Sequence, residues 1–303
     1  MNVLSLCDGI SCLRIALQRG GHKVDKYFAS EVKKSAIKCS KDNWNDIIQV
    51  GDVTKLHFKD GYLYNNDSKW YVGQFDLVAF GSPCQSFSNI NIWNDKEHYG
   101  LNGKSKLFFE CLRVLKEVNP KYFLFENVKM KKDAKSMLDK YMGVNGILIN
   151  SNLVSYQNRA RYYWTNIPNV TIPEDKHISF QDYIDRDTTE TKLSYSKSYI
   201  KMWKPNNDRA TLRVCRDITY SDKVDCITTK QQRCPNAGLI ACEDFCRTLT
   251  QREQEIGQTL PVGYTKCLSY NQACDVIGNG WTVDVIVHIL KGLEHSLIPM
   301  ANK

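Results

Sequence analysis

The first half of the chain alternates short apolar runs with longer amphipathic stretches, and this alternation is the strongest constraint on its fold. Five runs have the length and composition of buried strands: residues 3–6, 27–30, 47–50, 75–80 and 122–125. Three stretches between them have helical periodicity: residues 12–19, 33–43 and 106–118. Strands separated by helix-length segments are typical of βαβ units. We therefore predict an α/β fold with a mostly parallel sheet, which binds ligands beyond the carboxyl ends of its strands.

The alternation breaks down near Pro168. From there to about Cys242 the periodicity is poor and polar residues dominate. Helical character returns over residues 250–258 and 281–293. The simplest partition has three parts: an α/β domain (1–167), a basic insertion (168–244) and a C-terminal return (245–303).

The net charge is +8, from 41 Lys and Arg against 33 Asp and Glu. Between Arg186 and Arg233 there are eleven Lys or Arg and six Asp or Glu, so this part of the insertion supplies +5. The excess is compatible with a polyanionic partner and equally with simple solubility. No apolar run approaches the ~18–20 residues of a membrane span, and the first residues have no basic signal-peptide region. We expect a soluble cytoplasmic protein, without a membrane, whose twelve cysteines are mostly reduced thiols.

Three acidic residues follow three of the predicted strands. The first strand leads through Asp8 and Gly9 into a helix, and a glycine at such a turn lets a ligand approach the backbone. Glu31 is placed to accept both hydroxyls of a ribose, and Asp52 to accept an exocyclic amine. The dinucleotide pattern GxGxxG is absent. Either these acids are ordinary polar residues that close strands, or they bind a nucleoside-bearing cofactor; three in succession favour the cofactor.

Two further strand ends carry reactive groups. After the fourth strand, Pro83 constrains the backbone before Cys84, and nearby positive charge would favour the nucleophilic thiolate. Glu126 follows the fifth strand, where a carboxyl group in apolar surroundings can share a proton with a ring nitrogen. Arg159 and Arg161 face the same side of an extended segment and could stabilise a thiolate, a carbonyl oxygen or a phosphate. The alternative is a basic edge strand.

These residues lie in blocks that resemble those of the C5-cytosine DNA methyltransferases, especially compact phage and bacterial members akin to the mammalian de novo enzymes. Eight blocks occur in the family's order: Leu6-Cys7-Asp8-Gly9-Ile10-Ser11, Ala29-Ser30-Glu31, Gly51-Asp52-Val53, Gly81-Ser82-Pro83-Cys84-Gln85, Glu126-Asn127-Val128, Gln157-Asn158-Arg159-Ala160-Arg161, Arg247-Thr248-Leu249-Thr250-Gln251-Arg252-Glu253 and Gly278-Asn279-Gly280-Trp281-Thr282-Val283. The resemblance implies a Rossmann-like class I S-adenosylmethionine-dependent methyltransferase fold. It also implies that residues 168–244 form the target-recognition region and that 245–303 complete the catalytic domain.

The resemblance assigns the chemistry. It implies that a cytosine is flipped out of double-stranded DNA, because its reacting carbons cannot be attacked inside the stack. Cys84 would add to C6, and Glu126 would hydrogen-bond the N3/N4 edge and share the N3 proton. Arg161 would contact O2, and Arg159 would help to hold the thiolate and its loop. The methyl group would pass from S-adenosylmethionine to C5, leaving 5-methylcytosine and S-adenosylhomocysteine.

The resemblance also assigns the cofactor site. Around the methionine, the ribose and the adenine it places residues from the strand ends, together with a closing segment from the C-terminus: Asp8, Gly9, Ile10, Glu31, Val32, Asp52, Val53, Pro83, Asn279, Gly280 and Trp281. The stretch 86–106 is similar to the family's mobile loop that closes over DNA, with Gly100 and Gly103 as flexible points. No metal is implied.

Two positions depart from the family's pattern. Cys7 stands where members usually carry a phenylalanine that packs against adenine, so weaker cofactor binding is expected. Leu13 stands where close relatives tend to have glycine. Neither departure touches the four residues assigned to catalysis.

Several alternatives stay open. One branch of the family modifies tRNA with the same catalytic residues, so an RNA cytosine-C5 methyltransferase is the nearest rival. Another is a catalytically weakened DNA-binding homologue, suggested by Cys7. A metal site at the cysteines of the insertion is disfavoured because their spacings lack paired C-x₂-C motifs: Cys226, Cys234, Cys242 and Cys246. The sequence does not determine the target sequence or the choice between monomer and homodimer. It also leaves the role open between restriction–modification, an orphan enzyme and phage protection, in a bacterial cell or a phage-infected host.

Overall fold

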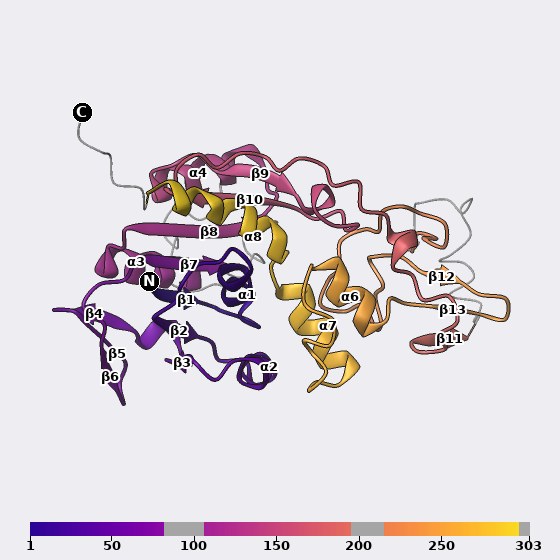
Figure 1. Cartoon of the computed structure of the whole chain (residues 1–303), viewed down its shortest axis with the longest axis horizontal. Helices are drawn as coiled ribbons and strands as arrows, with labels where there is room; N and C mark the ends of the chain where they lie inside the picture. Colours follow the sequence, from indigo (N-terminus) through magenta and orange to yellow (C-terminus); the bar gives the residue numbers. More distant parts are fainter. Residues whose placement is uncertain (82–105, 195–214, 297–303) are drawn as a thin grey trace, which may run out of the picture. The chain divides into compact units, whose positions relative to one another are not determined.

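The computed structural model describes residues 1–81, 106–194 and 215–296 (Figure 1). Pro83, Cys84 and the predicted loop up to residue 105 lie outside these ranges. The chain divides into two compact units. Unit 1 comprises Met1–Ile149, Ala160–Ile172 and Ile286–Lys303, and unit 2 comprises Asn150–Arg159 and Pro173–Val285. The predicted division into catalytic, recognition and return regions concerns function, and it stays a prediction.

Unit 1 is built on a seven-stranded sheet with the order β3-β2-β1-β7-β8-β10-β9 (Figure 1). Its strands are β1 (Asn2–Leu6), β2 (Lys26–Ser30), β3 (Ile47–Gln49), β7 (Leu77–Gly81), β8 (Tyr122–Val128), β9 (Ile147–Asn150) and β10 (Ala160–Thr165). Neighbouring strands from β3 to β8 run parallel, and β10 is antiparallel to β8. The predicted α/β class with a mostly parallel sheet is confirmed.

The helices of unit 1 are amphipathic. They are α1 (Cys12–Arg19), α2 (Lys34–Asn43), α3 (Lys106–Val118) and α4 (Lys132–Met142). Helices α1, α2 and α3 follow the prediction, whereas α4 was not predicted. Helix α1 buries one apolar face, with Leu13 and Leu17 on it, and ends at Gly20, whose N–H donates to Ala16 O. The predicted bounds of α1 and α3 are confirmed. These bounds were predictable because both helices have a clear apolar stripe and end at segments that contain glycine or proline.

A column of stacked aromatic rings runs across the middle of the sheet. Phe80, Phe125 and Trp164 lie on the adjacent strands β7, β8 and β10, and all three are buried. The Phe80 and Phe125 ring centroids are 4.7 Å apart, and those of Phe125 and Trp164 are 5.0 Å apart. Phe108 of α3 packs 5.2 Å from Phe125. Cross-strand aromatic contacts of this kind hold neighbouring strands in register.

The predicted end of the fifth strand was wrong, and the alternative of a basic edge strand is not what the structure has. Strand β8 continues to Val128, so Glu126 lies within the strand and not after it. Its backbone is held on both sides, because Glu126 is opposite Gly81 of β7 and Tyr163 of β10. The segment after Arg159 is not an edge strand, since β10 lies between β8 and β9.

A small antiparallel sheet that was not predicted follows β3. It consists of β4 (His57–Lys59), β5 (Tyr62–Tyr64) and β6 (Lys69–Tyr71), in that order. The turn between β4 and β5 contains Asp60 and Gly61, both with positive φ (51° and 79°). Aspartate and glycine are the residues that tolerate this conformation in hairpins. Strands of three residues are too short to give a clear period in the sequence.

Unit 2 has little regular structure, as the poor periodicity predicted. Strands β11 (Lys192–Ser194), β12 (Ile240–Ala241) and β13 (Phe245–Arg247) form an antiparallel sheet of order β11-β13-β12. Its helices are α6 (Gln251–Gly257) and α7 (Tyr270–Asn279), and α8 (Val283–Leu290) spans the boundary with unit 1. Short 3₁₀ turns occur in both units: η1 (Val53–Lys55), η3 (Ser151–Leu153), η4 (Phe180–Asp182) and η5 (Lys291–Ser296).

One stretch of the described chain, Tyr270–Leu293, is long and apolar enough to cross a membrane by length and mean hydropathy alone. The sequence analysis did not anticipate it, because Asn279, Gly280 and Asp284 interrupt its apolar run. In the structure it is the separate helices α7 and α8, and 67% of the apolar window is buried inside the protein. Core helices of ordinary globular proteins meet the same criteria.

Candidate active site

The turn from β1 into α1 has an unusual backbone. Cys7, Gly9 and Ser11 all have positive φ, of 53°, 62° and 59°. Only Gly9 adopts this conformation without steric cost. A Cβ atom placed on Gly9 would meet no atom within 4 Å, so the backbone at this turn faces open space. A ligand can therefore approach the main chain here, at the carboxyl edge of the sheet.

Glu31 connects this turn to the end of β2. Its Oε2 accepts a hydrogen bond from Gly9 N, and its Oε1 accepts from Val32 N and Lys33 N, each at 2.8 Å. The carboxylate is thus fixed in orientation, and Oε2, which accepts only one of these bonds, keeps room for a further donor. Val32, beside it, exposes 67% of its surface. A fixed acceptor next to an exposed apolar side chain fits a ribose and an adjoining flat ring.

Asp52 follows β3 and Gly51, whose φ is +80°. Its Oδ1 accepts from Thr54 N at 2.9 Å and caps η1. Among the described residues, Oδ2 has no hydrogen-bond partner and is available to an amine. Val53, the first residue of η1, is almost fully buried. The three predicted acids therefore do end successive strands at one edge of the parallel sheet.

Asp8 differs from the other two acids because it points into the protein. Its Oδ2 accepts from the Ser11 hydroxyl at 2.5 Å, and its Oδ1 accepts from the Tyr27 hydroxyl at 2.7 Å. Burial raises the pKa of Asp8 to about 6, against the opposing effect of these hydrogen bonds. The carboxyl group therefore titrates close to neutral pH. Ile10, between these residues, is fully buried.

Cys7 packs against the core of unit 1 beside Cys111 of α3. The hydrogen bond from Cys7, followed by burial, holds the pKa of the Cys111 thiol well above its usual value. The Cys111 thiol is therefore neutral and inert, and it lies beside Cys7 at this edge of the sheet. No signal in the sequence pointed to this pair.

Glu126 and Arg161 form an ion pair at the same edge. Arg161 Nε lies 3.1 Å from Glu126 Oε1, and only 14% and 12% of the two side chains are exposed. Glu126 is opposite Gly81, the last residue of β7. The chain that leaves β7 here carries Cys84, three residues further on and outside the described part. The ion pair thus lies beside the point where the segment with the predicted nucleophile begins.

Arg159 belongs to unit 2 and is only 4% exposed. Its guanidinium group donates to Ile227 O at 3.0 Å, Gly278 O at 3.1 Å and Gly280 O at 2.9 Å, and it lies 3.4 Å from Cys226 Sγ. The partners described for Arg161 are Glu126 and Ala160 O. The two side chains have different partners, and their common face stays a prediction.

Asn279 is the last residue of α7, and Gly280 and Trp281 follow it in the connection to α8. Gly280 O accepts from Arg159 and also from Gln258 Nε2 at 3.1 Å. Gln258 is fully buried, and its Oε1 accepts from the Thr282 hydroxyl at 2.8 Å. The sequence analysis missed Gln258, since a lone glutamine after a helix carries no functional signal. Asn279 itself is exposed.

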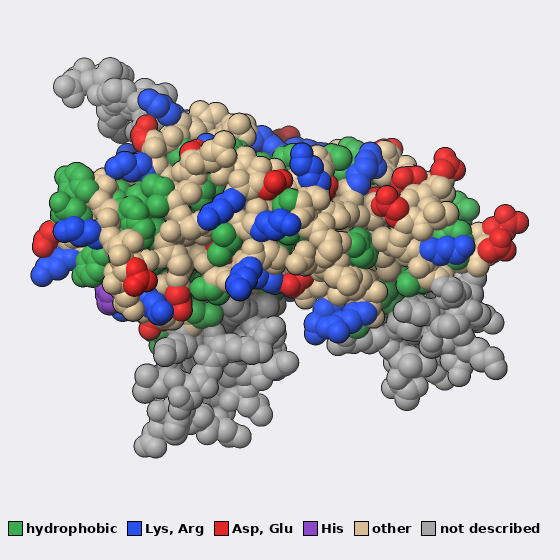
Figure 2. Space-filling model, turned by 90° about the horizontal axis from the view of Figure 1, so that it is seen from below, with side chains coloured by type: hydrophobic (Ala, Val, Ile, Leu, Met, Phe, Trp, Pro, Cys, Tyr) green, Lys and Arg blue, Asp and Glu red, His purple; other side chains and the backbone are tan. Residues whose placement is uncertain are grey.

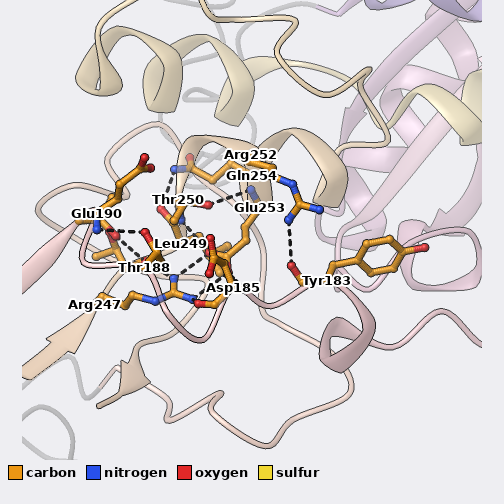
Figure 3. Close-up of polar contacts among 12 residues, drawn as sticks. Tyr183, Asp185, Thr188, Glu190, Arg247, Leu249, Thr250, Arg252, Glu253 and Gln254 are labelled. Carbon is orange, nitrogen blue, oxygen red and sulfur yellow. Dashed lines mark hydrogen bonds and ion pairs between the residues drawn. The ribbon is translucent and has the colours of Figure 1, made fainter. Parts of the chain in front are cut away.

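A buried ion pair organises the block that begins at Arg247 (Figure 3). Arg247 donates from both terminal nitrogens to the two oxygens of Glu253, each at 2.8 Å, and neither side chain is exposed. Glu253 also accepts from Asp185 N and Thr250 N, and Arg247 donates to Asp185 O. Thr250 and Glu253 form a capping box at the start of α6. The block therefore ties residues near 185 to α6.

No group of three or more His, Cys, Asp or Glu side chains suited to a metal ion occurs within residues 1–81, 106–194 and 215–296. Cys215, Cys234, Cys242 and Cys246 lie close enough in unit 2 to influence one another. Burial, with a smaller contribution from Cys234 and Cys246, raises the pKa of Cys215 to about 11. Burial also raises the pKa of the Cys246 thiol, so Cys215 and Cys246 stay protonated at neutral pH.

Residues 1–159 match the profile of the family described as C-5 cytosine-specific DNA methylase. That match covers more than half of the 303 residues. The chain belongs to the C-5 cytosine-specific DNA methylase family. The resemblance stated from the sequence blocks is thereby confirmed.

Known members of this C-5 cytosine methylase family are similar over part of the chain. The orphan methyltransferase M.Rho11sI of Bacillus phage rho11s is 31% identical over 191 residues, which are 59% of this chain and 35% of that protein. The type II methyltransferase M.HpaII of Haemophilus parainfluenzae is 28% identical over 228 residues, 68% of this chain and 59% of that protein. The chain thus spans between about a third and three fifths of the length of these relatives.

Solved structures support the fold over the whole chain. The S. pombe Dnmt2 methyltransferase superimposes with a TM-score of 0.67 at 19% identity, covering 98% of this chain and all of that one. The Entamoeba histolytica methyltransferase EhMeth gives 0.74 at 16% identity, covering 98% and 99%. At these identities the likeness concerns the fold alone. The chain has the class I methyltransferase fold.

Proposed function

We propose that this protein is a DNA (cytosine-5)-methyltransferase that acts on a cytosine flipped out of double-stranded DNA through a covalent bond between Cys84 and C6. The observation that carries the proposal is the Glu126–Arg161 ion pair at the carboxyl edge of the sheet, opposite the last residue of β7. A carboxyl group and a guanidinium group 3.1 Å apart suit the N3/N4 edge and the O2 atom of one cytosine. Membership in the family supports the same reading.

The substrate side follows from these groups. Glu126 shares a proton with N3 and Arg161 donates to O2, so electron density is withdrawn from the ring and C6 becomes electrophilic. The Cys84 thiolate adds to C6, and the electron pair of the C5–C6 double bond moves to C5. After C5 is methylated, a base removes the C5 proton and the electrons re-form the double bond as the Cys84 sulfur leaves.

The cofactor side suits S-adenosylmethionine, which supplies the methyl group when bound. Glu31 Oε2 has room for a ribose hydroxyl, Val32 offers an exposed apolar face, and Asp52 Oδ2 is available to an exocyclic amine. The open backbone at Gly9 leaves space for the methionine part. The remaining assignments follow the family's pattern: Asp8, Ile10, Val53, Pro83, Asn279, Gly280 and Trp281.

Arg159 has a narrower role in this proposal. Its donors are occupied by Ile227 O, Gly278 O and Gly280 O, so it positions the Asn279–Trp281 segment within unit 2. Any contribution to the thiolate is indirect. The basic residues of 168–244 form the target-recognition region and contact phosphates and bases of DNA. The protein then works in the cytoplasm of a bacterial or phage-infected cell.

Trapping of the covalent adduct tests the proposal. Duplex DNA that contains 5-fluorocytosine has no removable C5 proton, so an adduct with Cys84 persists on a denaturing gel when S-adenosylmethionine is added. We expect the adduct with the wild type and with the matched control Cys234→Ser, and none with Cys84→Ser. Bisulfite sequencing of DNA from a methylation-free host locates the target site in the same experiment series.

Three results would contradict the proposal. An adduct that persists in Cys84→Ser would assign another nucleophile. Methyl transfer to tRNA but not to duplex DNA, measured with labelled S-adenosylmethionine, would establish the RNA enzyme. Specific DNA binding without any methyl transfer would establish a catalytically weakened homologue.

A further inference from the structure

The small β4–β6 sheet has two chemically different faces. Successive side chains of a strand point to opposite sides, and the register pairs His57 with Tyr64 and Tyr64 with Lys69. Phe58, Leu63 and Trp70, one from each strand, pack against the core of unit 1. The alternate residues of the three strands therefore face away from the core, and we call them the outer face: His57, Lys59, Tyr62, Tyr64, Lys69 and Tyr71.

The outer face combines aromatic rings with positive charge and has no acidic residue. Tyr62 and Tyr71 are 37% and 63% exposed, which is uncommon for large aromatic side chains. In Figure 2, green side chains, a class that includes tyrosine, lie beside blue lysine or arginine side chains over this end of unit 1. Asp60 and Asp67 are in the hairpin turns and not on the strands.

The aromatic rings are arranged in two rows across the strands. Tyr62 and Tyr71 have ring centroids 5.1 Å apart, and Lys69 Nζ lies 4.9 Å from the centre of the Tyr62 ring. His57 stacks on Tyr64 at 5.7 Å with an angle of 27° between the rings. At the far edge, Glu117 of α3 lies 3.7 Å from His57 Nδ1 but is already paired with Arg113 at 2.7 Å. Asp60 and Asp67, in the adjoining turns, are the other acidic residues described near these strands.

We propose that the outer face of the β4–β6 sheet binds single-stranded nucleic acid, as a contact separate from the methylation site. Exposed aromatic rings on a sheet stack on unpaired bases, and lysines between them pair with phosphates. Paired bases inside a duplex do not offer their flat faces to such rings, so the ligand is single-stranded. The face spans three strands about 5 Å apart, which is room for two or three nucleotides. This proposal does not depend on methyl transfer.

Binding of thymine-only oligonucleotides tests the proposal with the full chain. Such a strand contains no cytosine, so the methylation site has no target base to capture. We expect the affinity of a fluorescein-labelled 12-nucleotide strand to fall about fivefold in Tyr62→Ala, which corresponds to the lower end of the energy range for stacking one base on an aromatic ring. The affinity should fall further in Tyr62→Ala/Tyr71→Ala. Tyr62→Phe keeps the ring and should bind nearly as the wild type. The matched control is Tyr141→Ala, on α4 and 41% exposed, which should change nothing.

A second measurement needs no variant. A strand containing 5-iodouracil, cross-linked by light to the wild type, should modify a peptide that contains residues 57–71, as identified by mass spectrometry. Equal affinities for the wild type and the double variant, or cross-links confined to other peptides, would overturn the proposal. So would recovery of a protein partner on this face together with no change in oligonucleotide affinity. Methyl transfer to duplex DNA, assayed in parallel, reports separately on the proposed enzyme activity.

Discussion

At the scale of single residues, the β1–α1 turn combines backbone strain with a buried acid. Cys7 and Ser11 are non-glycine residues in the left-handed region, which costs each of them roughly 1 kcal/mol. The hydrogen bond from Ser11 to Asp8, and the one from Tyr27, compensate part of that cost. Backbone strain and a carboxyl group with a raised pKa within one five-residue turn are typical of a binding site and not of a turn that only stabilises the fold.

Asp8 should make stability depend on pH. Its folded pKa of about 6 lies above the unfolded value of 3.8, so the native state holds its proton more tightly, and this contribution is lost as pH rises from about 4 through 6. Asp8→Asn should therefore raise the free energy of unfolding at pH 8 by roughly 1–2 kcal/mol, less than the full shift because Asp8 is partly exposed. Urea unfolding from pH 4 to 8 measures this. A gain that is the same at every pH would contradict it.

Cys7→Phe tests the departure from the family's pattern. Cys7 begins the β1–α1 turn, where it packs against the core of unit 1, and its side chain has too little surface to pack against an adenine as well. A phenylalanine adds a large apolar contact, so S-adenosylmethionine should bind several-fold more tightly. Calorimetric titration measures the affinity. The control is Val262→Phe, at an exposed position of unit 2, because Cys12 on α1 is buried and Cys12→Phe would disturb the core. Unchanged affinity in Cys7→Phe would rule out this explanation of the substitution.

At the scale of secondary-structure elements, short segments are held by buried polar groups. Arg247 of β13 and Glu253 of α6 are six residues apart, fully buried and doubly hydrogen-bonded (Figure 3). In unit 2, where described helices and strands are short, such contacts replace much of the packing that the large sheet gives unit 1. The cost of removing one partner is therefore high, because the other is left as an unpaired buried charge.

Arg247→Ala should lower the free energy of unfolding by about 3–5 kcal/mol. Arg252 lies in the same block, is exposed, and donates to Tyr183 O at 3.2 Å. Arg252→Ala should change stability by less than about 0.5 kcal/mol and is the matched control. Urea unfolding followed by tryptophan fluorescence measures both. Similar values for the two variants would show that the buried pair contributes nothing special.

At the scale of the whole molecule, neither unit is a continuous piece of chain. The chain passes between the units after residues 149, 159, 172 and 285. The segment that matches the family profile, residues 1–159, ends before β10, the strand that lies between β8 and β9. The segment that matches the family profile therefore does not coincide with either compact unit of the protein.

A chain of residues 1–159 should not fold. It lacks β10, so β8 loses its antiparallel neighbour, and it lacks Trp164, whose ring stacks on Phe125 in the core. Loss of a large buried aromatic residue alone costs about 3–5 kcal/mol, a large part of the stability of a typical domain. Circular dichroism and amide chemical-shift dispersion, with the full chain as control, measure the outcome. A cooperative unfolding transition in the short chain would contradict the expectation.

Most of unit 1 was predictable because its strands and helices are patterned over enough residues. The bounds of α1 and α3, the parallel sheet and the three acids after β1, β2 and β3 all follow from periodicity and order. The β4–β6 sheet was not predicted, although the Asp60-Gly61 pair is a hairpin signal. Three-residue strands are defined by their partners, and these partners are not visible in a single segment.

The sequence by itself determined the class of fold, the family and the order of the site residues along the chain, because these depend on local pattern and on blocks of adjacent residues. Only the tertiary structure decided how the side chains are used. Arg159 and Arg161 are two residues apart, yet one is held by backbone carbonyls of unit 2 and the other pairs with Glu126. The partners of a buried charge come from segments that are distant in sequence, so its role is decided when the chain folds.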